Sequence, residues 1–217
     1  MRKVPPGGSA ISVWRPWRDM KAVFALVRKY AAAEDRRVAT ANLVALVLAW
    51  NTPFYPLYLL GAAGATMGKG VWLTLCSFPV FLAVPAITRR HSSWGRVLLG
   101  VAATGNTLFC TWLLGEASGT WLFLLPCITL AALLFRRSES GALFLLMGLP
   151  MVTGIAMSGR YPLSSFACSG AACSAIVWLN AVSVAILLAF LGVLATGLAD
   201  PGQHIRPGFD DVRPTRQ

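Results

Sequence analysis

Long apolar runs alternate along the chain with short polar segments. The runs cover residues 38–60, 71–87, 97–114, 120–135, 142–157 and 175–198. A helix that crosses the hydrocarbon core of a bilayer needs about 20 such residues, and the fourth and fifth runs approach that length with their flanking residues. Strand-like alternation of apolar and polar positions is absent. The pattern therefore predicts an all-α fold, a polytopic membrane bundle of six transmembrane helices.

Composition and charge support this prediction. The chain is 56% hydrophobic and only 12% charged, whereas soluble domains are about 25% charged. Nine of the nineteen Lys and Arg residues lie in the first 37 residues, and only seven lie between residues 38 and 198. We expect three parts: a basic cytoplasmic segment over 1–37, the six-helix transmembrane domain over 38–198, and a disordered cytoplasmic tail over 199–217.

The distribution of Lys and Arg also predicts an orientation, because cytoplasmic segments of membrane proteins carry the excess of these residues. Seventeen of them fall in the two terminal segments and in the second and fourth loops, while the other loops hold only Lys69 and Arg160. We expect a multi-pass protein of the bacterial inner membrane with both termini in the cytoplasm. The outer loops are then residues 61–70, 115–119 and 158–174.

The N-terminal segment contains a basic amphipathic helix pattern over about residues 14–34. Its polar face carries Arg18, Lys21, Arg28 and Lys29. Such a helix binds anionic lipid at the inner leaflet, with about 1 kcal/mol from each basic residue. Docking of this face on a protein partner is the alternative interpretation. Binding to nucleic acid is not expected, because membrane topology accounts for most of the net charge of +11.

Few groups in the apolar runs could carry chemistry. The sequence has no HExxH, no GxSxG and no phosphate-binding glycine loop, and His91 and His204 lie outside the runs. No acid or base interrupts a run away from its ends, so the parts of a proton relay are missing. We expect no catalytic residue, no metal and no cofactor, and the chain is not predicted to be an enzyme.

Polar residues inside the runs have two interpretations. Asn and Thr side chains hold membrane helices together, at about 0.6–2 kcal/mol for each interhelical hydrogen bond. The alternative is a small-molecule pocket lined by Asn51, Asn106, Trp112 and Trp121. The two Trp residues also fit a simpler role, since aromatic rings gather at the membrane interface and anchor the helices there.

The third and fourth runs are joined by the turn GEASG, which contains a single acid, Glu116. We expect Glu116 to help shape a tight hairpin rather than to act in catalysis or transport. The amide groups at the start of the next helix, around residues 119–121, could accept its carboxylate, and Ser118 could cap the same helix start.

The outer loop at 158–174 contains two cysteines, Cys168 and Cys173, in the segment ACSGAACS. An oxidising exterior would permit a disulfide between them. Their spacing allows such a structural bridge and does not require it. The other three cysteines lie inside apolar runs, where cysteine is usually a packing residue.

From the third run onward, TGNTLFCTWLLGEASGTWLFLLPCITLAALLFRRSE resembles the six-helix membrane modules at the N-termini of some bacterial class III adenylate cyclases, diguanylate cyclases and sensor histidine kinases. Those modules have a Gly-containing outer hairpin followed by an aromatic residue, a Pro and a basic cytoplasmic stop. The matching residues here are Gly115, Ser118, Gly119, Phe123, Pro126, Arg136 and Arg137.

The resemblance covers residues 20–198. The output domain of those enzymes has no counterpart in this sequence. The resemblance implies a non-enzymatic sensor or regulatory membrane module that acts through a separate protein partner or as a homodimer. Two other classes fit the same features: a membrane-bound anti-sigma-type regulator that uses the N-terminal helix, and a small transporter subunit or assembly factor of a membrane complex.

Overall fold

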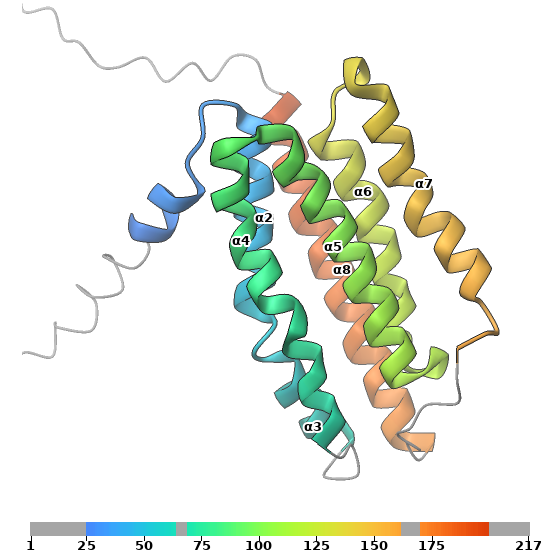
Figure 1. Ribbon diagram of the computed structural model, residues 1–217. Helices are drawn as coiled ribbons and strands as arrows, with labels where there is room; N and C mark the ends of the chain where they lie inside the picture. Colours follow the sequence, from blue (N-terminus) through green and yellow to red (C-terminus); the bar gives the residue numbers. More distant parts are fainter. Residues whose placement is uncertain (1–24, 64–68, 162–169, 200–217) are drawn as a thin grey trace, which may run out of the picture.

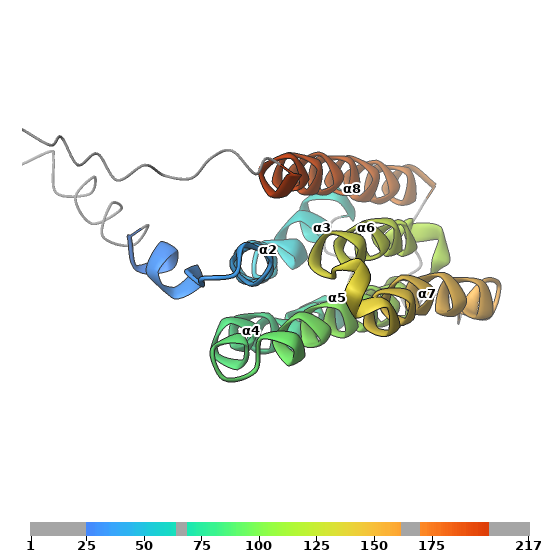
Figure 2. The ribbon, with the colours of Figure 1, turned by 90° about the horizontal axis from the view of Figure 1, so that it is seen from above.

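The computed structural model describes residues 25–63, 69–161 and 170–199, and these form a bundle of helices (Figure 1). Residues 25–31 are helical. The elements that follow are α2 (Arg36–Asn51), α3 (Tyr55–Ala63), η2 (Lys69–Ser77), α4 (Phe78–Arg90), α5 (Ser92–Leu114), η3 (Glu116–Ser118), η4 (Thr120–Phe123), α6 (Leu124–Leu134), η5 (Arg137–Glu139), α7 (Ser140–Met157) and α8 (Gly170–Ala199). When the bundle is seen from above, α4 and α5 lie on one side and α8 lies on the other, with α2, α3 and α6 between them (Figure 2).

The predicted all-helical membrane fold is confirmed. The described helices account for four or five of the six predicted spans. Among the described residues, four helices are long and apolar enough to cross a bilayer: Gly70–Arg90, Ser92–Leu114, Arg137–Met157 and Gly170–Ala199. A fifth span results if α2 and α3, which meet at a bend of 44°, count as one. The apolar helix Thr120–Leu134 is shorter, at about 22 Å against a hydrocarbon core of about 30 Å. The sixth span therefore stays a prediction.

Charged residues collect at one end of the bundle. The arginine-bearing ends of α2, α4 and α5 lie together at the top of Figure 1 with the start of α7, which follows Arg136 and Arg137, and α8 also ends there. The 115–119 hairpin lies at the opposite end. The lateral surface between the ends is apolar, with Phe144, Ile155 and Val193 more than two-thirds exposed. Lipid is the solvent that suits such a surface.

The main core fills the space between α2, α4, α5 and α6. Val44, Phe81, Leu99 and Leu134 are each no more than 2% exposed in this core. A second apolar cluster lies near the hairpin end and joins α3, η2, α5 and α8. The polar site described below is lined by residues of the main core, such as Val44 and Phe81, and by Tyr55, which packs against the second cluster.

At the arginine-bearing end, two arginines satisfy the last carbonyl groups of α6. The Arg96 guanidinium is buried, donates to the Leu134 carbonyl at 2.8 Å, and forms an ion pair with Glu139. Arg37 of α2 donates to the carbonyls of Leu133 and Phe135, at 2.8 and 2.9 Å. Because the last carbonyls of a helix lack intrahelical partners, these bonds stabilise the end of a short helix.

A close approach between α4 and α5 involves another buried polar group. A Cβ added at Gly95 would lie 2.1 Å from Cγ2 of Thr88 and 2.8 Å from its backbone nitrogen. The Thr88 hydroxyl donates to Asn42 at 2.7 Å, and the Asn42 amide donates to the Ala31 carbonyl at 3.1 Å. Asn42 therefore holds helices together, as expected for a polar residue in a membrane span.

The predicted N-terminal helix is only partly described. Arg28 and Lys29 are exposed on the helical residues 25–31, while Arg18 and Lys21 lie outside the described residues. The tail at 200–217 also lies outside them. The domain boundaries and the interfacial role of this helix stay predictions.

Candidate functional site: a cavity at a broken helix

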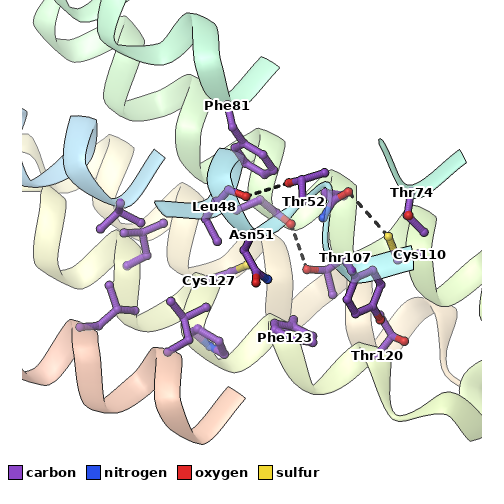
Figure 3. Close-up of a pocket in the computed structure, with 18 residues that line it drawn as sticks. Leu48, Asn51, Thr52, Thr74, Phe81, Thr107, Cys110, Thr120, Phe123 and Cys127 are labelled. Atoms are coloured by element: carbon purple, nitrogen blue, oxygen red, sulfur yellow. Dashed lines mark hydrogen bonds between the residues drawn. The ribbon is translucent and has the colours of Figure 1, made fainter. Parts of the chain in front are cut away.

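A cavity of about 100 Å³ lies where α2 gives way to α3. Its walls come from these two helices and from η2, α4, α5, η4, α6 and α8 (Figure 3). The lining includes the polar residues Asn51, Thr52, Tyr55, Thr74, Asn106, Thr107 and Thr120 and the thiols Cys110 and Cys127. The remaining lining residues are apolar.

The break between α2 and α3 follows from its local sequence, Asn51-Thr52-Pro53. Proline has no N–H group and cannot continue the hydrogen-bond ladder of a helix. The last turn of α2 is closed instead by Thr52, whose amide and hydroxyl both donate to the Leu48 carbonyl, at 3.0 and 2.7 Å. Irregular backbone at membrane depth is tolerated where it lines a cavity, and Asn51 and Thr52 at this break both line one.

The structure brings together two of the four residues predicted for a small-molecule pocket. Asn51 and Asn106 line the cavity from α2 and α5. Trp112 and Trp121 do not line it: they are 51% and 44% exposed on the outside of the bundle. Their placement outside the cavity has a geometric reason, since their positions on α5 and η4 direct the rings away from the neighbouring helices.

The two asparagine amides have hydrogen-bonding capacity to spare. The Asn106 carbonyl oxygen receives only the weak thiol donor of Cys110, at 3.7 Å. The Asn51 side chain makes no hydrogen bond with any described residue, and it extends into the middle of the cavity (Figure 3). By contrast, the Thr52, Thr74 and Thr107 hydroxyls are already bonded to backbone carbonyls.

A buried polar network connects the cavity with the hairpin and α8. The Tyr55 hydroxyl donates to the Asn180 side-chain oxygen at 3.1 Å, and the Asn180 amide donates to the Ser118 carbonyl at 2.9 Å and to the Thr120 hydroxyl at 3.2 Å. Asn180, Ser118 and Thr120 are each at most 2% exposed. Tyr55 and Thr120 line the cavity as well, so the network forms part of its wall.

This network was not predicted from the sequence. The available signal was the polar interruption at residues 51–53, directly before Tyr55, together with Asn180 in the middle of the last apolar run. Neither feature shows which residues meet, because the partners are 125 positions apart.

The GEASG turn is built on two glycines with positive φ. Gly115 has φ 81° and ψ 160°, and Gly119 has φ 70°. The Ser118 hydroxyl accepts a hydrogen bond from the Thr120 amide at 3.2 Å, but the N-cap position of the next helix is Gly119, without a side-chain cap, so the predicted Ser118 cap was wrong. The turn is tight because both glycines take backbone conformations that other residues rarely adopt.

The expected partner of Glu116 was wrong. Its carboxylate accepts from the Gly159 amide at 3.0 Å and the Ser158 hydroxyl at 3.4 Å, in the turn after α7. The amides of Gly119 and Thr120 at the start of the next helix already donate to the Glu116 carbonyl and the Ser118 hydroxyl within the hairpin. The Glu116 carboxylate therefore bonds to the turn after α7 instead. Burial, together with this carboxylate, raises the pKa of Tyr161.

The cysteines divide into two groups. Cys76, Cys110 and Cys127 are free. Cys173, in the first turn of α8, is disulfide-bonded, but Cys168 lies outside the described residues, so the predicted bridge between these two stays a prediction. Within the described part of the chain, no group of His, Cys, Asp and Glu is arranged to hold a metal ion.

Together, these features define a helical, multi-pass membrane protein with a small cavity at a broken helix. Comparison with protein families then identifies it: residues 27–196 match the MASE7 family, a membrane-associated sensor domain. The match covers most of the chain, so the chain belongs to the MASE7 family. It confirms the predicted resemblance to the membrane sensor modules of signalling enzymes. No curated protein and no solved structure matches the chain.

Proposed function

We propose that this MASE7 chain is the input module of a bacterial signalling system and that the cavity at the α2–α3 break is its input site. The family match over residues 27–196 carries the proposal. The module is itself non-enzymatic and acts on a separate signalling protein or through a homodimer. It spans the inner membrane six times, with both termini in the cytoplasm.

The charge distribution supports this orientation. The end of the bundle that carries Arg36, Arg90, Arg96 and Arg136 is the cytoplasmic end under the positive-inside rule. Arg18, Lys21, Arg28 and Lys29 then face the anionic inner leaflet, next to the place where a cytoplasmic partner would dock. The cavity lies toward the other end, near the hairpin.

The hydrogen bond between Tyr55 and Asn180 supplies a route from the cavity to the cytoplasmic end. Tyr55 is both a wall residue and the partner of Asn180 on α8. This helix is 30 residues long, or about 45 Å, and it extends from the hairpin end to the arginine-bearing end (Figure 1). A ligand that prefers one position of Tyr55 thereby favours one position of α8, which is the differential contact that a population shift requires.

The test has two steps. The full chain is cross-linked in native membranes and purified, and the captured partner is identified. The activity of that partner is then measured in native membranes. We expect a signalling enzyme, whose activity changes several-fold when the wild-type chain is supplied and much less with Asn180→Leu. Thr153→Val is the matched control, because it removes only local hydrogen bonds to the Leu149 and Pro150 carbonyls within α7. Capture of a transcription factor, or of a larger membrane assembly without signalling activity, would contradict the proposal.

A further inference from the structure

We infer that the cavity binds a small neutral molecule with a hydroxyl head and a short apolar body, the chemistry of a short-chain alcohol. The inference rests on the proposed role of the cavity as the input site. Charge, hydrogen-bonding capacity, size and access each contribute to it.

The lining excludes a charged ligand. None of the lining residues is Asp, Glu, Lys, Arg or His. An ion in this position would be buried without a counter-charge, and burial of an unpaired charge is strongly unfavourable. The occupant is therefore neutral.

The free polar atoms define the head of the ligand. Asn51 and Asn106 bring two amides to the cavity from α2 and α5, and each amide can both donate and accept. The Asn51 amide is without a hydrogen bond among the described residues, and the Asn106 oxygen has only a long contact with the Cys110 thiol. A hydroxyl matches this pair because it also donates and accepts through a single atom.

Size and shape define the rest of the molecule. The cavity measures about 100 Å³, and a protein cavity of about 150 Å³ holds benzene. The ligand therefore has roughly four or five non-hydrogen atoms by the same scale. Its carbon chain would lie against Phe123, Leu187 and Leu191, the apolar side of the lining.

Access to the cavity is on the membrane side. Asn51 is exposed at the surface of the bundle, next to Trp50, which is 73% exposed, whereas the lining residues Thr107 and Thr120 are buried. A small neutral amphiphile partitions into lipid and can enter there without crossing a polar barrier.

Thiol protection tests the inference on the purified full chain. Cys110 and Cys127 line the cavity, while the free Cys76 is exposed and does not. The probe is 1-butanol, and the measurement is the rate at which each thiol reacts with methyl methanethiosulfonate, followed by mass spectrometry. We expect 1-butanol to slow the reactions of Cys110 and Cys127 at least three-fold relative to the reaction of Cys76. Equal concentrations of butyrate or butylammonium should leave all three reaction rates unchanged. Equal protection by the charged probes, or equal slowing of Cys76, would overturn the inference.

Calorimetric titration of 1-butanol keeps the test decisive if the buried thiols react too slowly. Ala103→Leu fills the cavity and Asn51→Leu removes the free amide, so we expect either change to weaken 1-butanol binding at least ten-fold. Ala132→Leu makes the same substitution as Ala103→Leu at an exposed position of α6 outside the cavity and should bind like the wild type. Unchanged binding in Ala103→Leu would place the alcohol elsewhere and overturn the inference.

These experiments distinguish a failure of the inferred ligand class from a failure of the proposed input role. Binding of 1-butanol with no change in the activity of the captured partner would contradict the proposed input role. A change in partner activity on Asn51→Leu, in a protein that does not bind 1-butanol, would overturn the ligand class alone.

Discussion

The Tyr55 hydroxyl donates a hydrogen bond to the Asn180 side chain, with 3.1 Å between the two oxygens, and this bond ties α3 to α8. Asn180 is fully buried, and its amide is also bonded to the hairpin through Ser118 and Thr120. Tyr55 is thus the point at which the cavity, the hairpin and the long C-terminal helix of the MASE7 domain meet.

Loss of this hydroxyl should cost measurable stability. Tyr55→Phe leaves the Asn180 oxygen without its donor in an apolar environment, and we expect a loss of about 0.6–1.7 kcal/mol, the range for interhelical hydrogen bonds in membranes. Thermal unfolding in detergent gives the measurement. Tyr58→Phe is the matched control, because the Tyr58 side chain is 47% exposed and this change should have no effect. Equal melting temperatures for both variants would show that the bond contributes nothing.

The contact between α4 and α5 predicts a sharp difference between two glycines of one helix. Gly95→Ala places a methyl group against the backbone of Thr88, and such overpacking costs about 1–3 kcal/mol. Gly105→Ala has nothing within 4 Å of the new carbon and should change stability by less than about 0.5 kcal/mol. The comparison is made by denaturation in mixed micelles. A Gly95→Ala variant as stable as Gly105→Ala would mean that the helices separate without cost.

The hairpin should depend on its glycines far more than on its acid. Gly115→Ala puts a side chain on a conformation that is essentially restricted to glycine, at a cost of about 1–3 kcal/mol, and adding Gly119→Ala should disturb the turn further. Glu116→Gln should leave insertion and function nearly intact, because the amide oxygen can still accept from Gly159 at an exposed site. Circular dichroism and detergent melting curves compare the variants. If Glu116→Gln abolished signalling at unchanged stability, Glu116 would become a ligand-site candidate.

Topology can be tested with single cysteines on a cysteine-free background. Ser92 and Ser138 are exposed at the arginine-bearing end, and Ala117 is exposed in the hairpin at the other end. Ser118 is unsuitable as a reporter, since it is 2% exposed. An impermeant maleimide added to intact cells should label Ala117→Cys and not Ser92→Cys or Ser138→Cys. Permeabilised cells, in which all three should react, provide the control, and the reverse pattern in intact cells would invert the proposed orientation.

The sequence alone determined the membrane class, the helical fold and the sensor family of this protein. These properties depend on composition and on local pattern: about 20 consecutive apolar residues specify a membrane helix wherever they pack. The glycine-dependent hairpin was predictable for the same reason, because a tight turn is formed by residues that are adjacent in the chain.

The tertiary structure alone decided which polar residues meet. Asn51 and Asn106 were predicted to line a pocket, but Trp112 and Trp121 lie outside it, and Tyr55 and Thr120 take their place in the wall. Glu116 likewise bonds to a turn 43 residues away instead of its own helix start. The direction in which a side chain points depends on the rotation of each helix about its axis. That rotation is set by the packing of all its neighbours, which no local pattern records.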